Sequence, residues 1–163
     1  KKAFAIGVRM EHPQQLINEN QYGECSTSLP AADYKLTYTT QEGRGVYSFC
    51  MCPGGFVVNA SSEEGRLAVN GMSNYDRSER NANSAIVVAV KPEDFVYYGQ
   101  VEDTPLAGME FQRQLETLAY RTGKGQIPVQ MYTDFRERKA SRGLGAIICD
   151  VLYINFNNYN MPI

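Results

Sequence analysis

The sequence lacks three features that would assign it to a membrane, secreted or nucleic-acid-binding class. No apolar run approaches the ~20 residues that a membrane-spanning helix needs. The first residues, Lys-Lys-Ala-Phe-Ala, do not form a secretory signal peptide. The formal net charge of −2 gives no reason to expect nucleic acid or an anionic membrane as a partner. We therefore expect a cytoplasmic domain that binds neither.

Nucleotide-binding and metal-binding motifs are scarce as well. The G-x-G-x-x-G turn of a dinucleotide-binding unit is absent, and the Gly-x-Gly pairs at 43–45 and 143–145 are isolated. There is one histidine, His12, and four cysteines. Cys50 and Cys52 are separated by one residue, whereas a zinc knuckle uses two. The sequence thus predicts no metal site, free thiols, and no cofactor bound by this chain alone.

The patterns that are present predict an α+β domain over residues 1–163, with no repeat or linker to divide it. The long helix is expected over 104–122, where apolar residues recur at spacings of four and three. Short helices are expected after Pro13 and over 134–142, and a strand-like segment over 147–156. The sheet is expected to be mainly antiparallel, and able to curl into a barrel, with strands near Phe4, Tyr34, Val46, Phe56, Arg66 and Ser84.

The densest set of unusual residues is Cys-Met-Cys-Pro-Gly-Gly at positions 50–55. It predicts a tight turn between two strands, because Pro fixes φ and Gly accepts positive φ. In an extended segment Cys50 and Cys52 would point to the same face. The functional interpretation is that the thiols line a pocket and that Gly54 and Gly55 let the backbone approach a ligand. The structural interpretation is that these are small buried residues in a tight turn, and the residues alone leave both open.

Three other sets of residues also admit two interpretations. Asn70 and Asn74 lie in a polar turn after a strand, a common place for ligand contacts, yet such turns also use Asn for its backbone conformation. His12 is either a general base or a structural residue at a strand end. The four cations of the charged segment would either approach a cofactor phosphate or neighbouring domain, or form a solvated helix face: Arg136, Arg138, Lys139 and Arg142.

Several segments resemble one known family, in the family's order. They are FAIGVRMEHPQQLIN followed by QYG, GRGVYSFCMCPGG, NASSEEGRLAVNGMS, NANSAIVVAV, and PVQMYTDFRERKASRGLG. From Phe4 to Gly145 the chain resembles bacterial FAD-dependent dehydrogenases, the NAD(FAD)-utilising dehydrogenases. The resemblance implies a domain inserted between the FAD-binding parts of a larger flavoprotein, with FAD in the parent protein and not on this segment. After Gly145 the Asn-rich end departs from the family pattern.

The function that this resemblance implies is the substrate-side or insertion domain of an FAD-dependent oxidoreductase, not catalytic alone. Its partners would be the flanking FAD-binding domain of the same chain and a small-molecule substrate. The alternative is a non-catalytic binding or dimerisation module, and homo-oligomer formation stays open. Because the chain does not begin with Met, we expect it to be part of a longer protein. The residues expected to contact the substrate are Cys50, Cys52, Gly54, Gly55, Asn70 and Asn74.

Overall fold

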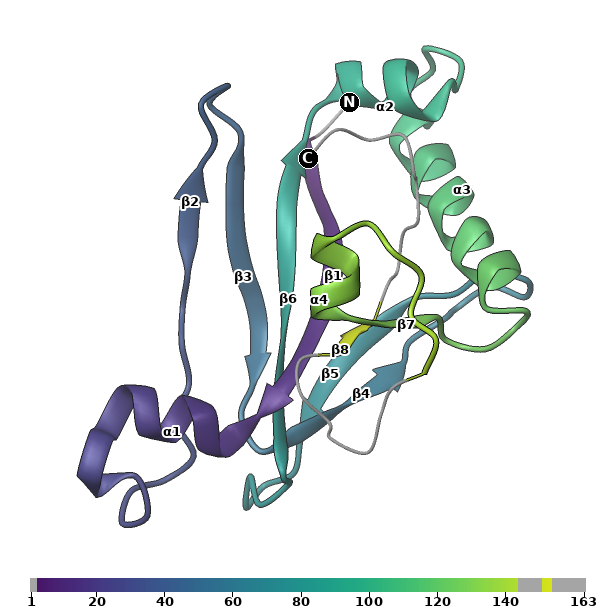
Figure 1. The fold of residues 1–163 in the computed structure, drawn as a ribbon. Coiled ribbons are helices and arrows are strands. Elements are labelled where there is room, and N and C mark those ends of the chain that lie inside the picture. The colour runs from purple at the N-terminus through teal and green to yellow at the C-terminus, as the bar shows by residue number, and fades with distance from the viewer. Residues whose placement is uncertain (1–2, 144–150, 154–163) are drawn as a thin grey trace.

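The computed structural model describes residues 3–143 and the backbone of residues 151–153. Its main element is an open six-stranded sheet in the order β2-β3-β6-β1-β8-β7, in which every pair is antiparallel (Figure 1). In that order the strands are Thr37–Thr39, Gly45–Cys52, Asn81–Val90, Phe4–Pro13, Val151–Tyr153 and Val129–Met131. A separate two-stranded sheet pairs β4 (Gly55–Asn59) with β5 (Val69–Ser73).

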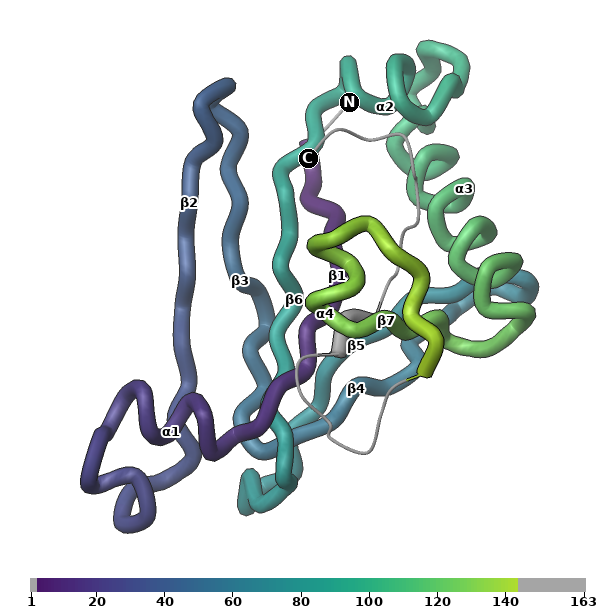
Figure 2. The backbone as a smooth tube through the Cα atoms, viewed as in Figure 1, coloured from purple at the N-terminus to yellow at the C-terminus, as the bar shows by residue number. Residues whose placement is uncertain are grey.

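The helices are short except for one. They are α1 (Gln14–Tyr22), the 3-10 turn η1 (Gly23–Cys25), α2 (Pro92–Gly99), α3 (Ala107–Thr122) and α4 (Tyr132–Arg136). Helices α2 and α3 lie together beside one end of the β1–β6 pair, while α1 lies at the opposite end (Figures 1 and 2). The prediction of an α+β fold with a mainly antiparallel sheet and one long helix is therefore confirmed. Both sheets are open, so no closed barrel is present in the described part of the chain.

The β1–β6 pair is the centre of the fold, and its register runs unbroken from Phe4 opposite Val90 to Pro13 opposite Asn81. The alternation of β1 places Phe4 and Ile6 on one face. That face packs against α2 and α3 to form the apolar core, which consists of Ile6, Val90, Phe95, Val101, Ala107, Phe111 and Leu115. The core thus occupies one end of the sheet and leaves the other end to polar side chains.

Helix α2 is not among the helices predicted from the sequence. Pro92 stands in the first turn, where its missing N–H costs nothing, and the Asp94 carboxylate accepts a hydrogen bond from Lys91 N at 2.7 Å. The predicted helix over 134–142 is also wrong in extent, since α4 ends at Arg136. Arg138 has φ of +57°, which ends the helical turn.

Two smaller predictions are corrected by packing. Glu116 was assigned to the solvated side of the long helix, but it is buried and its carbonyl accepts a hydrogen bond from Leu67 N at 3.0 Å. The strand expected near Arg66 begins at Val69, because the preceding loop packs Leu67 against α3. Of the strand expected over 147–156, β8 at Val151–Tyr153 is described, and the rest of that segment lies outside the described residues.

Candidate functional site

Arg9 of β1 is the centre of a buried polar cluster, although its side chain carries a charge. The residue is 3% exposed. Its Nη1 and Nη2 both donate to the carbonyl oxygen of Cys50 at 3.1 Å, and Nη1 also donates to Asn83 Oδ1 at 2.5 Å. Nη2 reaches Asn70 Oδ1 at 3.3 Å, and Nη1 lies 4.0 Å from Cys52 Sγ. We call these five residues the Arg9 cluster.

The Arg9 cluster is unusual because, among the described residues, no carboxylate pairs with its buried positive charge. No Asp or Glu of the described residues is among its hydrogen-bond partners. Buried charges are ordinarily paired, since their transfer from water is costly. Burial lowers the pKa of Arg9 below its ordinary value, and attraction to Cys52, Cys50 and Tyr34 acts in the opposite direction. The carbonyl and amide oxygens around Arg9 therefore replace water, and no carboxylate in the described part of the chain neutralises the charge.

A bend in β3 brings the cysteines to Arg9. The ladder between β3 and β6 shifts register between Phe49 and Cys52, and Cys50 has φ of +47°, which is rare for a residue other than Gly. This bulge turns the Cys50 carbonyl toward the guanidinium. It also leaves Cys50 exposed at the surface and Cys52 half-buried beneath it. Strained backbone of this kind is concentrated at functional sites.

Strand β5 closes the cluster from the other side, and Gly71 is the residue that permits it. A Cβ atom at Gly71 would lie 2.1 Å from Arg9 Nη1 and 2.2 Å from Asn83 Oδ1. Asn83 is wholly buried, and its Nδ2 has no hydrogen-bond partner among the described residues. The two sheets thus meet over a guanidinium and an amide donor that remains unsatisfied.

A second set of polar contacts fixes the turn that follows the cysteines. Gln14 Oε1 accepts a hydrogen bond from Gly54 N at 2.7 Å, and its Nε2 donates to Ala32 O. His12 Nε2 lies 2.8 Å from the Tyr34 hydroxyl, and the buried Nδ1 of His12 has no hydrogen-bond partner among the described residues. His12 is thus buried near the end of β1, at the same end of the sheet as Arg9.

The residues predicted to contact substrate are only partly brought together. Cys50, Cys52 and Asn70 converge on Arg9, as described above. Asn74 lies in a separate exposed turn, where its Nδ2 donates to Glu79 Oε1 at 3.1 Å. The cations of the charged segment are exposed, and within the described chain none of them is hydrogen-bonded to the Arg9 side chain: Arg136, Arg138, Lys139 and Arg142.

Close contacts inside the domain explain why positions 54 and 55 are glycines. Gly54 has φ of +46°, and a Cβ there would lie 1.7 Å from the carbonyl oxygen of Arg77. A Cβ at Gly55 would lie 2.2 Å from the carbonyl oxygen of Met72. Both residues are buried. The close backbone approach that two glycines allow is thus made to neighbouring loops and strands, and their contact with a substrate stays a prediction.

Sequence reasoning missed Arg9 and Asn83. The sequence predicts strands near Phe4 and Ser84, but neither Arg9 nor Asn83 is among the predicted site residues. The available signal was the continued alternation of polar residues past each apolar run, with Arg9 and Glu11 in one strand and Asn81 and Asn83 in its neighbour. Their burial depends on β4 and β5 packing across the sheet, which no local pattern predicts.

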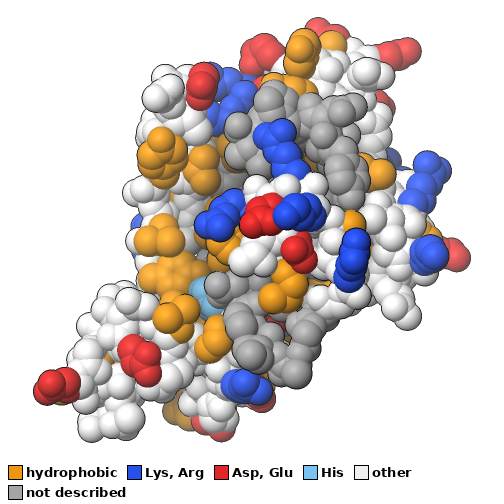
Figure 3. Space-filling view, viewed as in Figure 1, with side chains coloured by type: hydrophobic (Ala, Val, Ile, Leu, Met, Phe, Trp, Pro, Cys, Tyr) orange, Lys and Arg blue, Asp and Glu red, His pale blue; other side chains and the backbone are white. Residues whose placement is uncertain are grey.

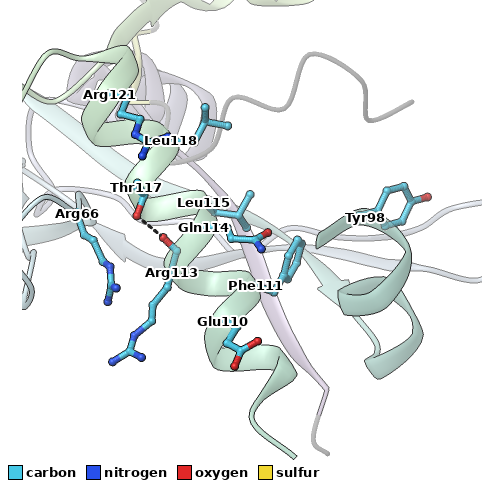
Figure 4. A pocket seen from close by; sticks show the side chains of 10 residues that line it. All are labelled: Arg66, Tyr98, Glu110, Phe111, Arg113, Gln114, Leu115, Thr117, Leu118 and Arg121. Carbon is cyan, nitrogen blue, oxygen red and sulfur yellow. Dashed lines mark hydrogen bonds between the residues drawn. The ribbon is translucent and has the colours of Figure 1, made fainter. Parts of the chain in front are cut away.

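Away from the Arg9 cluster, a hollow of about 590 Å³ lies along α3 (Figure 4). Two of its arginines are already paired, since Arg66 and Arg113 both contact the Glu63 carboxylate. Its lining residues are Arg66, Tyr98, Glu110, Phe111, Arg113, Gln114, Leu115, Thr117, Leu118 and Arg121. Because these side chains are open to solvent, which screens their charges, the hollow offers weaker electrostatic interactions than the Arg9 cluster.

The described residues do not supply the usual ligands of a metal ion. No group of three or more His, Cys, Asp or Glu among them is arranged to hold one. A helix N-terminus can bind a pyrophosphate through its free N–H groups. Acidic side chains stand in the first turns of α2 and α3, whereas the first turn of α1 has none. Within the described segments, no helix is both long and apolar enough to cross a membrane.

The comparison with known families bears directly on this geometry. Residues 3–158 match the family described as "FAD-dependent protein, C-terminal domain-like". The chain belongs to this family. An uncharacterized protein of Clostridium beijerinckii is 57% identical over 152 residues, which cover 90% of this chain and 28% of the relative. The chain therefore spans less than a third of the relative's length, and the resemblance to FAD-dependent proteins is confirmed at the level of the domain family.

Proposed function

We propose that this domain is the substrate-side part of an FAD-dependent oxidoreductase, inserted between the parts that bind FAD. The observation that carries the proposal is the cysteine corner, residues 50–55, lying on the Arg9 cluster in a member of an FAD-dependent family. Strained backbone at an exposed thiol, together with a buried charge that no described carboxylate pairs with, costs folding free energy. Such features are most readily explained by a ligand-binding role.

The residues of the corner and its surroundings would have separate roles in binding a ligand. Cys50 is exposed and can touch a ligand directly. Arg9 gives the corner a positive potential, which favours a substrate that brings negative charge or a carbonyl oxygen to it. Asn70 and Cys52 orient the guanidinium, and Gly54 holds the following turn through Gln14. FAD chemistry would be supplied by the flanking domain, since this sequence contains no G-x-G-x-x-G turn.

The test uses the full-length protein and measures how fast single cysteines are alkylated. If the corner faces the flavin or the substrate pocket, Cys50 should react several-fold more slowly in the FAD-bound protein than in the FAD-free protein. Cys25 is exposed, lies elsewhere in the fold and serves as the matched control. Equal rates at Cys50 in the two forms, with an unchanged rate at Cys25, would contradict the proposal.

A second readout separates function from folding. Cys52→Ser should shift the flavin reduction potential or lower turnover, while the melting temperature stays close to that of the wild type. Gly54→Val is not suitable for this purpose, because its side chain would collide with Arg77 and destabilise the domain regardless of function. A Cys52→Ser protein with normal potential and normal turnover would contradict a role of the corner in the flavin reaction.

One observation favours the alternative of a dimerisation module. Strand β2 is an edge strand, and Leu36 and Tyr38 on or beside it are 56% and 65% exposed. Apolar side chains gather on the β2–β3 side of the face in Figure 3. A second copy could pair along this edge across a two-fold axis. Sedimentation should then detect a dimer that Tyr38→Lys abolishes, and a wild-type monomer at high concentration would exclude this module.

A further inference from the structure

The bend in β3 places Cys50 and Cys52 in a geometry that differs from that of an ordinary strand. In an extended strand the Cα atoms of residues i and i+2 lie roughly 6.6 Å apart, close to the upper limit of about 6.8 Å for a disulfide. Here the positive φ of Cys50 and the register shift bend the chain between them. Cys52 Sγ donates to the Cys50 carbonyl oxygen at 3.3 Å, so the inner thiol is folded back toward Cys50.

The two thiols also have different surroundings. Cys50 is exposed, whereas Cys52 is half-buried and lies 4.0 Å from Arg9 Nη1. An outer thiol can meet a molecule from solution, and an inner thiol beside a cation can complete a reaction that the outer thiol begins. Negative charge develops on the sulfur of an attacking thiol, and the guanidinium of Arg9 lies where it would stabilise that charge.

We propose that Cys50 and Cys52 form a redox-active pair that exchanges with small-molecule disulfides. The sulfur of Cys50 attacks a disulfide R–S–S–R, the S–S bond breaks, and one thiol RSH leaves. Cys52 then attacks the Cys50 sulfur of the mixed disulfide and releases the second RSH. The two cysteines lose two electrons and two protons, which end on the two RSH molecules, and the Cys50–Cys52 disulfide has formed.

The disulfide of this pair is expected to be labile. It would close a loop with a single intervening residue, so it gains little from restricting the unfolded chain. A bond between residues i and i+2 is also strained, and strained, exposed disulfides are the more readily reduced ones. The positive charge of Arg9 further favours the reduced pair. A structural role for such a bond is therefore unfavourable, while reversible exchange is favoured.

This exchange goes beyond the proposed flavoprotein function and does not depend on it. It requires the two cysteines, Arg9 and an external disulfide, and no step involves the flavin. A protein could therefore show exchange at the corner while the corner faces away from the flavin, or the reverse. The two proposals fail in different experiments.

The test equilibrates the full-length protein with mixtures of reduced and oxidised glutathione, followed by acid quenching, alkylation and mass spectrometry of the peptide that contains both cysteines. The expected result is a joint transition, in which the peptide carries either two labels or none. Cys52→Ser should trap glutathione on Cys50, and Cys50→Ser should leave Cys52 slow to react. Cys25 should never take part in a joint transition.

Arg9 is tested as a positioning residue through the equilibrium and not through activity. Arg9→Gln should shift the midpoint toward the disulfide by about tenfold in the glutathione ratio, and Arg9→Lys should restore part of the shift. Circular dichroism of each variant establishes that it is folded. Three results would overturn the proposal: independent glutathione adducts on the two cysteines, a disulfide that forms only in urea, or a transition that Cys149→Ser abolishes.

Discussion

The two ends of the β1–β6 pair bury opposite kinds of side chain. At the α2–α3 end, Ile6 and Val90 pack with Phe95 and Phe111 into an apolar core. At the other end the same two strands bury Arg9 and Asn83, with an unsatisfied amide donor and a charge that no described carboxylate neutralises. The first arrangement stabilises the fold, whereas the second costs desolvation free energy.

This difference supports the proposal that the functional site lies at the cysteine end. At the apolar end, α2 and α3 cover the same two strands with apolar side chains, so covering this sheet does not require a buried charge. Local rules of packing and polar satisfaction are broken in natural proteins chiefly where a site requires it. The exposed strained thiol of Cys50 lies at the end where these rules are broken. The comparison can be tested by substituting matched residues at each end.

The largest loss of stability is expected for a substitution at the apolar end. Phe111→Ala should lower the free energy of unfolding by about 3–5 kcal/mol, because it removes a fully buried ring that packs on Phe95 and Gly99. Chemical denaturation measures the change. Phe49→Ala is the matched control at the cysteine end, since Phe49 is 57% exposed, and it should change stability by less than about 0.5 kcal/mol. Similar losses for both variants would contradict the comparison.

The apolar end was also the more predictable one. The spacing of Phe111, Leu115 and Leu118 predicted α3, and the alternation from Phe4 predicted β1, because both elements bury one face against a single core. Helix α2 was missed, although Pro92 is well suited to a first helical turn. Apolar periodicity is a local signal, so errors at this end are confined to element boundaries and one short helix.

At the cysteine end the turn was predictable but its partners were not. Pro53 and Gly54 predicted the tight turn between β3 and β4 correctly. The burial of Arg9 depends on residues 41 and 74 positions away, Cys50 and Asn83, and on Gly71 admitting β5. No period or motif encodes such contacts between distant segments. Polar clusters are therefore found from the structure, whereas apolar cores are found from the sequence.

The next largest loss of stability is expected for a substitution in the turn at the cysteine end. Gly54→Ala should lower the free energy of unfolding by about 2–4 kcal/mol, because a Cβ is strained at φ of +46° and would also collide with the Arg77 carbonyl. Gly43→Ala is the control: its φ is +75°, but a Cβ there meets nothing within 4 Å, so only the strain of about 1 kcal/mol applies. Equal losses in denaturation would show that the turn is not packed against residue 77.

The smallest effect is a pH dependence at the apolar end, where the buried carboxylate of Asp94 is paired with Arg44. Asp94 accepts bonds from Arg44 at 2.7 and 3.0 Å and caps α2 through Lys91 N. The hydrogen bonds from Arg44 hold the pKa of Asp94 below its usual range. A carboxyl with a lowered pKa stabilises the fold above its unfolded pKa of about 3.9, and this contribution is lost as pH falls through the folded pKa.

Asp94→Asn keeps the shape and the cap but removes the charge, so it should lower stability by about 1–2 kcal/mol at pH 7. The difference between wild type and variant should shrink as the pH falls below about 4, because the wild-type carboxyl then becomes neutral too. Urea denaturation at pH 7, 5 and 3 measures it, with Arg44→Gln as the reciprocal variant. A difference that stays constant over this range would mean that the pair acts through shape alone, and the contrast with Arg9 would then not be one of charge.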